Sequence, residues 1–113
     1  MSFEIKTSTY FDSEIKKLSK RHKSLKDDLK ELRQELTNNP SAGVEIAPCI
    51  RKVRMSIKSK RRGKSAGARV ITYDALVCDN EGTLYLLLIY DKSDATNVKM
   101  NVIEDIIKEL LGE

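Results

Sequence analysis

The sequence predicts an α+β domain in which an antiparallel, twisted sheet carries its helices on one face. Leucines recur at spacings of four, three and four residues between Leu25 and Leu36, which is the period of an amphipathic helix. From Ile50 onward the apolar residues follow a period of two, which is typical of strands. The 113 residues suffice for one hydrophobic core, so we expect a single domain spanning residues 1–113.

The first part of the chain predicts a short strand and two helices. Residues 3–7 alternate between apolar and polar side chains, as in a half-buried strand. Thr9 lies three residues before Asp12, a spacing that is typical of a helix cap. Ser24 and Asp27 repeat this spacing, so we expect the first helix to break before them and a second helix to follow and cover the sheet.

The rest of the chain predicts three strands and a final helix. Residues 38–43 contain a proline and a glycine, which end the second helix. Strands joined by hairpins are expected over residues 50–57, 69–78 and 84–90. The last two carry apolar residues on both faces, which indicates central positions in the sheet. A helix is expected after residues 97–101, so the predicted order of elements is β-α-α-β-β-β-α.

The composition is that of a globular protein, with 40% apolar and 34% charged residues. No apolar run approaches the roughly 18 residues that a membrane helix requires, so no membrane association is expected. The first residues lack the basic and then apolar layout of a signal peptide. We therefore expect a cytoplasmic protein, and we interpret Cys49 and Cys78 as reduced thiols in or near the core.

The positive charge is concentrated between Arg51 and Arg69, where nine residues are Lys or Arg and none is Asp or Glu. The whole chain has 21 basic and 17 acidic residues; without this stretch 12 basic residues would face 17 acidic ones, a net charge of −5 instead of +4. Such a concentrated field favours a polyanionic partner, because clustered cations displace counterions from phosphates. A solvated basic loop is the alternative interpretation.

Two classes of catalysis are disfavoured. The Gly-Lys-Ser tripeptide at residues 63–65 is similar to the end of a nucleotide-binding P-loop, but that motif requires a glycine where Lys58 stands. We therefore exclude ATP and GTP. Metal catalysis lacks ligands, since the chain has one histidine, no close pair of cysteines and no carboxylate in residues 46–73. We expect no cofactor, and we interpret the histidine, His22, as a surface residue.

A pair of cations on the first hairpin strand is the strongest candidate for a site. Lys52 and Arg54 share one face of this strand and lie about 7 Å apart at ~3.3 Å per residue. Tyr90 ends the last strand and is interpreted either as a group that stacks on a base or passes a proton, or as an aromatic residue at the rim of the core. Lys92 either pairs with a neighbouring aspartate or points into the same basic surface.

Four segments of the chain carry a family resemblance: residues 39–46 (NPSAGVEI), 50–54 (IRKVR), 63–71 (GKSAGARVI) and 86–93 (LLLIYDKS). In content and order they resemble the RelE/ParE superfamily of bacterial toxins, and within it the HigB-like branch. The resemblance implies a RelE-like fold and a type II toxin that cleaves mRNA on the ribosome. Because the sequence lacks evident metal ligands, we expect the toxin to be a metal-independent endoribonuclease. It also implies a cognate antitoxin as partner, with the toxin monomeric when free.

Carried over by position, the resemblance implies catalytic roles for Lys52, Arg54, Arg69 and Lys92. The first two correspond to a basic pair on the first hairpin strand, and Arg69 corresponds to an arginine of the next strand. The tyrosine that many relatives carry further along has no counterpart at that position, so either Tyr90 takes its catalytic role or proton transfer differs. The other cations of the basic stretch are expected to bind RNA: Arg51, Lys58, Lys60, Arg61, Arg62 and Lys64.

Cleavage of RNA through its 2′-hydroxyl requires a base, an acid at the leaving oxygen and positive charge on the developing phosphorane. Arg54 and Arg69 suit the last role, because guanidinium groups pair with phosphate oxygens through two parallel hydrogen bonds. Lys52 is the candidate base, since neighbouring like charges favour the neutral amine. Two other functions stay open: a ParE-like poison of DNA gyrase, and a nucleic-acid-binding module that does not cleave.

Overall fold

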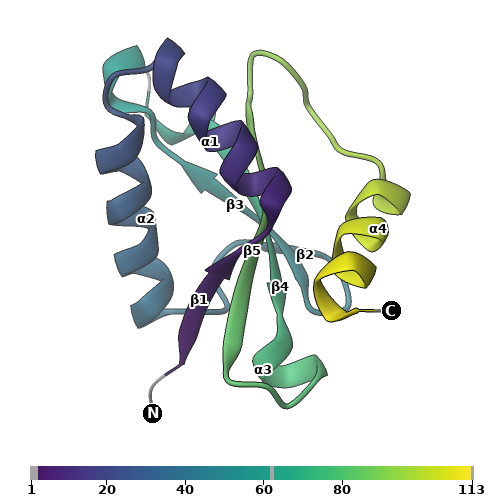
Figure 1. The fold of residues 1–113 in the computed structure, drawn as a ribbon. Coiled ribbons are helices and arrows are strands. Elements are labelled where there is room, and N and C mark those ends of the chain that lie inside the picture. Colours follow the sequence, from purple (N-terminus) through teal and green to yellow (C-terminus); the bar gives the residue numbers. More distant parts are fainter. Residues whose placement is uncertain (1–2, 62, 113) are drawn as a thin grey trace.

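A mixed five-stranded sheet runs through the middle of the molecule, with helices on both sides (Figure 1). The computed structural model describes residues 3–61 and 63–112. Along the chain the elements are β1 (Glu4–Thr7), α1 (Thr9–Arg21), α2 (Leu25–Asn38), β2 (Val44–Ala47), β3 (Ile50–Met55), β4 (Ala68–Asp74), α3 (Ala75–Cys78), β5 (Thr83–Asp91) and α4 (Met100–Leu111). The predicted α+β class is confirmed. Within the described residues, no helix is both long enough and apolar enough to span a membrane.

The strands are ordered β1-β5-β4-β3-β2 across the sheet. β1 pairs with β5 in parallel, and every other pair is antiparallel. This differs from the wholly antiparallel sheet that was expected, because α1 and α2 carry the chain from one edge of the sheet to the other. Successive hairpins then return it until β5 lies beside β1. The strand β2 and the short helix α3 are additions to the predicted order.

The helices cover both faces of the sheet, whereas the sequence predicted one covered face. α1 and α2 pack on the first face, where Leu32 lies in one apolar cluster with Val53 and Val70. α4 packs on the opposite face, where Ile103 lies in a second cluster with Ile71. The physical reason is visible in β4 and β5, which are apolar on both faces, so that each face requires a cover.

A bulge between β4 and β5 explains the unbroken apolar run of the last strand. Ile71 pairs with Leu88, but the next residue, Thr72, pairs with Leu86. The extra residue reverses the alternation of β5. Leu86 and Ile89 therefore both belong to the cluster beneath α1 and α2, although they lie three residues apart. At the bulge the neighbours Leu87 and Leu88 both belong to the cluster beneath α4.

Cys49 and Cys78 form a disulfide, which contradicts the expectation of two reduced thiols. β4 ends at Asp74 instead of continuing to Cys78, and α3 then turns the chain back. Because Ile50 pairs with Tyr73, Cys49 lies beside the residues that follow β4. The N–H of Asp74 also donates to the Cys49 carbonyl at 2.8 Å. Pairing of β3 with β4 thus brings together cysteines that are 29 residues apart.

The cap of α1 is Ser8, one residue before the predicted Thr9. Its hydroxyl accepts a hydrogen bond from the N–H of Phe11 at 2.9 Å and donates to the carbonyl of Leu87 in β5 at 2.5 Å. Ser8 is buried, so this one side chain both starts the helix and ties it to the sheet.

Candidate functional site

An open groove lies beside β3, between the end of α2 and the segment that leads from β5 to α4. Its volume is about 690 Å³. Five basic residues line it: Lys52, Arg54, Lys64, Arg69 and Lys92. We term it the cationic groove. It contains four of the five predicted catalytic residues and one of the predicted RNA-binding residues.

β3 directs Lys52 and Arg54 toward the groove. They flank the buried Val53, so both side chains leave the same face of the strand. The Lys52 ammonium donates to the side-chain oxygen of Asn97 at 2.9 Å. Arg54 is exposed and has no hydrogen-bond or ion-pair partner among the residues that the structure describes. Since β2 pairs with β3 only as far as Lys52, Arg54 projects from an uncovered part of the strand.

Arg69 lies opposite Arg54 in β4, yet its side chain is buried. Its guanidinium donates at 3.0–3.1 Å to three backbone carbonyls, those of Lys64, Ser65 and Ala68. These hydrogen bonds hold the basic loop, which we define as residues 58–67, against the start of β4. Gly67 makes this possible, because a Cβ there would lie 2.0 Å from the Met55 carbonyl oxygen. Arg69 therefore shapes the wall of the groove.

Tyr90 and Lys92 lie at the end of β5 and play different parts. Tyr90 is 9% exposed, and its hydroxyl donates to the Thr96 carbonyl at 3.2 Å, so it anchors the segment that follows β5. It does not line the groove. The backbone N–H of Lys92 donates to the Gly67 carbonyl at 2.9 Å, which joins β5 to the basic loop. Its ammonium has no carboxylate partner within residues 3–61 and 63–112.

A buried carboxylate outside the groove gathers a second set of cations, which we term the Asp91 cluster. Asp91 is 1% exposed and accepts hydrogen bonds from Lys60 at 2.5 Å, from the Ser93 hydroxyl at 2.6 Å and from His22 at 2.8 Å. Arg21 lies 3.3 Å from the same carboxylate. Burial alone would raise the pKa of Asp91, but the hydrogen bonds from Lys60, Ser93 and His22 outweigh it and hold that pKa well below its ordinary value.

The Asp91 cluster corrects the interpretation of His22 as a surface residue. The imidazole is largely buried and is hydrogen-bonded to a carboxylate from the far end of β5. The cluster ties the junction between α1 and α2 to the basic loop, because Lys60 belongs to that loop. Ser24 adds a second tie, since its hydroxyl accepts a hydrogen bond from the N–H of Ser59 at 2.9 Å.

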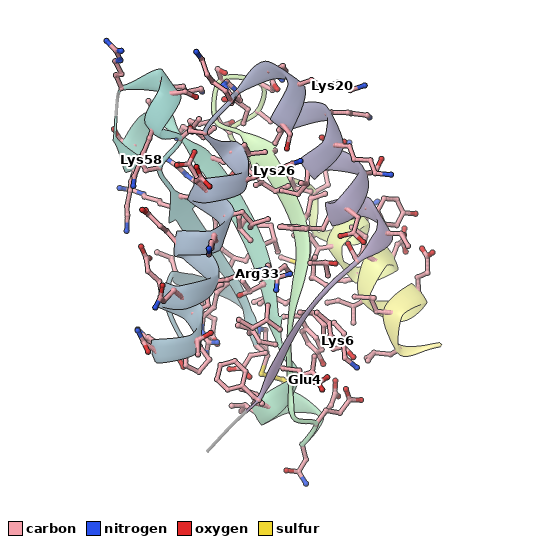
Figure 2. All side chains as sticks on the ribbon, turned by 60° about the vertical axis from the view of Figure 1, so that its left-hand side comes forward. Glu4, Lys6, Lys20, Lys26, Arg33 and Lys58 are labelled. Atoms are coloured by element: carbon pink, nitrogen blue, oxygen red, sulfur yellow. A yellow bond between two sulfur atoms is a disulfide. The ribbon has the colours of Figure 1, made fainter. Side chains whose placement is uncertain are left out.

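Two further predicted RNA-binding residues have carboxylate partners. Arg51 donates to Asp74 at 2.9 Å, and both side chains are largely buried. Lys58 pairs with Glu31 of α2, and in Figure 2 it lies beside the first turns of that helix. The hydrogen bond that its ammonium donates to Glu31 raises the pKa of Lys58 above its ordinary value. In these residues, as in Lys60, the positive charge is matched within the protein.

The last three predicted RNA-binding residues belong to the basic loop. Lys64 lines the groove and lies 3.5 Å from Glu35. Arg61 is exposed and adopts a left-handed backbone conformation, with φ of 58°. Arg62 lies outside the described residues.

Sequence patterns did not indicate Glu35, Thr96 and Asn97, which also line the groove. Glu35 lies between two leucines of the apolar stripe of α2, and from the sequence it has the pattern of a solvent-exposed helix residue. Thr96 and Asn97 belong to an irregular segment without periodicity. The antiparallel pairing of β4 with β5 brings that segment to β3, so its role depends on the tertiary fold.

The groove is suited to binding a chain of phosphates. Its ammonium and guanidinium groups donate hydrogen bonds to anionic oxygens, and they surround a space open to solvent. Within the described part of the chain, no three His, Cys, Asp or Glu side chains gather as they would around a metal ion. The groove therefore offers positive charge and proton donors from side chains.

The structure is thus an α+β domain in which a cationic groove lies beside β3. The chain is similar to the crystal structure of the isolated E. coli RelE toxin, P21 form, with a TM-score of 0.58 and 14% sequence identity. The match covers 96% of this chain and 99% of that one. No protein-family model matches the sequence, and no curated protein matches it. The likeness confirms the predicted RelE-like fold.

Proposed function

We propose that this chain is the toxin of a type II toxin–antitoxin system and cleaves mRNA on the ribosome as a metal-independent endoribonuclease. The observation that carries the proposal is the gathering of five basic side chains around one groove in a RelE-like domain. Such a field attracts a polyphosphate chain. The four sequence segments described above support placing the chain in the RelE/ParE superfamily, within its HigB-like branch.

In this proposal, the groove residues bind the RNA backbone at the cleavage point. Arg54, whose guanidinium has no partner in the described structure, holds the nonbridging oxygens and stabilises the phosphorane. Lys64 and Lys92 neutralise the neighbouring phosphates. Arg69 adds positive charge from the adjacent strand while it holds the loop wall. Arg61 extends the contact along the basic loop.

Lys52 donates the proton that the leaving oxygen requires in the proposed reaction, instead of acting as the base that the sequence suggested, because a protonated ammonium is a donor. It lines the groove, and its ammonium donates to Asn97. The 2′-hydroxyl of the RNA loses its proton to a base as its oxygen bonds to phosphorus, and the bond from phosphorus to the 5′-oxygen breaks. That oxygen takes a proton from the Lys52 ammonium, which leaves a 2′,3′-cyclic phosphate and a 5′-hydroxyl. Tyr90 acts as a positioning residue, because its hydroxyl holds the Thr96 carbonyl next to Asn97.

The charge of the groove also suggests how the toxin is restrained. We propose that a cognate antitoxin covers the groove with an acidic segment and so competes with RNA for Arg54 and Lys92. The toxin is then monomeric when free and acts in the cytoplasm, where mRNA and ribosomes are found. Co-expression of the antitoxin is expected to restore growth.

A cleavage assay tests the proposal. Purified protein is mixed with a defined mRNA in the presence of EDTA, with and without programmed ribosomes. We expect cuts in the ribosome-bound mRNA and fragments that end in a 2′,3′-cyclic phosphate. RNA binding with steep salt dependence but no cleavage would favour the binding module. Double-strand DNA breaks with intact transcripts after induction would favour the gyrase poison.

A further inference from the structure

Glu35 brings a carboxylate into the cationic groove. Among the described residues that line the groove, it is the one acidic side chain. Its oxygen lies 3.5 Å from the Lys64 ammonium, and half of its side chain is exposed to solvent. The sequence assigned this part of α2 to covering the sheet, so no role for Glu35 was expected.

The position of Glu35 is fixed by packing around it. Leu32 and Leu36 are buried beneath α2, so the rotation of the helix is set and Glu35 projects from its flank. After the helix, Gly43 has a φ of +99° and lies so close to β3 that a Cβ would be 2.6 Å from the Lys52 carbonyl oxygen. The end of α2 is therefore held beside the strand that bears Lys52. A site built on such elements is more rigid than one on loops.

Glu35 lies near the cations that are proposed to bind the phosphate. Together with Arg54 and Lys64 it lines a small second hollow at the flank of α2. The other charged groups at this hollow are Asp28 and Glu31, from the same helix. A phosphate bound to Arg54 and Lys64 would compete with Glu35 for the Lys64 ammonium. The carboxylate would then be free to accept a proton inside the groove.

The basic side chains leave the acceptor of the 2′-hydroxyl proton unassigned. A protonated lysine or arginine donates hydrogen bonds and has no lone pair to accept a proton. Lys52 would first have to lose its own proton before it served as a base. An ionised carboxylate accepts a proton directly, and general bases of this kind contribute about 10²- to 10⁴-fold to a rate.

We propose that Glu35 is the general base of the reaction, an inference that rests on the function proposed above. A carboxylate oxygen takes the proton of the 2′-hydroxyl as the 2′-oxygen bonds to phosphorus. The bond from phosphorus to the 5′-oxygen breaks, and that oxygen takes a proton from the Lys52 ammonium. Lys52 is then the acid of the reaction. Proton exchange with water returns both groups to their starting states.

The test compares Glu35→Gln, Glu35→Asp and the control Glu31→Gln in single-turnover cleavage of mRNA on programmed ribosomes. Glu31 is a matched control because it lies one turn earlier on α2, pairs with Lys58 and is similarly exposed. We expect Glu35→Gln to cleave about 100-fold more slowly. Glu35→Asp retains a carboxylate and should stay within about tenfold of wild type, and Glu31→Gln should stay within about twofold. The cleavage rate of the wild type should fall as the pH is lowered, whereas the cleavage rate of Glu35→Gln should not show this fall.

Binding separates a catalytic role from a structural one. The affinity of Glu35→Gln for an RNA with a 2′-deoxy nucleotide at the cleavage point should equal that of the wild type or exceed it, since a negative charge leaves the groove. Cleavage by Glu35→Gln within twofold of an active wild type would overturn this inference alone. Equal losses of binding and of cleavage in Glu35→Gln would also overturn this inference. A cleavage rate of Glu35→Gln that still falls toward acid pH would do so as well. An inactive wild type would overturn both this inference and the proposed function.

Discussion

The cationic groove and the Asp91 cluster draw on the same basic stretch and use it in opposite ways. In the cluster, Lys60 and His22 surround a buried carboxylate, so their hydrogen bonds hold the fold together. In the groove, Arg54 and Lys92 have no carboxylate partner in the part of the chain that the structure describes. The comparison shows that a count of basic residues overstates the charge offered to a ligand. The carboxylates on neighbouring elements decide which cations stay available.

The comparison predicts its largest effect on activity at Arg54. Arg54→Ala should slow cleavage of ribosome-bound mRNA by about 10²- to 10³-fold, because it removes a charge-assisted donor from the transition state. Its free energy of unfolding should change by less than about 0.5 kcal/mol, since the side chain is exposed. The control is Arg33→Ala, which removes an exposed arginine from α2 outside the groove (Figure 2). Equal activity of the two variants would contradict the assignment.

The Asp91 cluster predicts the largest effect on stability. Asp91→Asn should lower the free energy of unfolding by about 3 kcal/mol, because it leaves the largely buried Lys60 ammonium without its counterion. Urea titration measures the loss. Asp94→Asn is the matched control, since Asp94 pairs with Arg21 but is half exposed, so that solvent screens the pair and its loss should cost far less stability. A difference between the two of less than about 0.5 kcal/mol would mean that the cluster does not hold the fold.

The lowered pKa of Asp91 predicts loss of stability in acid. A carboxyl whose pKa is lower in the folded state than in the unfolded state contributes its full stability above the unfolded value and loses it as the pH falls. The free energy of unfolding should therefore decline between about pH 5 and pH 1. Asp91→Asn should show a shallower decline, measured by urea titration at a series of pH values. Parallel curves for the two proteins would argue against this assignment.

Arg51 tests whether a cation of the basic stretch serves the stability of the fold or the binding of RNA, with a smaller expected change in stability than at Asp91. It belongs to the basic stretch but pairs with the buried Asp74. Arg51→Gln should lower the free energy of unfolding by about 2 kcal/mol, because Asp74 loses a charged hydrogen bond. The affinity of the folded protein for RNA should stay within about twofold of wild type. A large loss of affinity at unchanged stability would move Arg51 into the binding surface.

Local periodicity was enough to predict most elements of the fold. The leucine stripe of α2 and the alternation in β3 are properties of neighbouring residues, and both helix and strand appear where expected. Which face each helix covers depends on contacts far apart in the sequence. The apolar residues on both faces of β4 and β5 held the necessary signal, since two apolar faces require two covers. The pattern alone indicates a central position in the sheet, but it does not specify which helix covers which face.

The site was predictable where it lies on a strand and hidden where it depends on tertiary contacts. Lys52 and Arg54 share the face that alternation assigns to them, and both line the groove. Glu35 comes from a helix, and no local pattern distinguishes it from a solvated residue. The disulfide was missed for the same reason, because Cys49 and Cys78 meet through strand pairing and the turn at α3. Pairing between charges of distant segments, as in the Asp91 cluster, also leaves no local signature.

The most direct test of the central claim is to map the 5′ ends of mRNA in cells after brief induction of the wild type and of Arg54→Ala. If the cationic groove cleaves mRNA on the ribosome, new 5′ ends should appear within coding regions, in register with codons, for the wild type and vanish for Arg54→Ala. Intact transcripts for the wild type, or the same cuts for both proteins, would contradict the account.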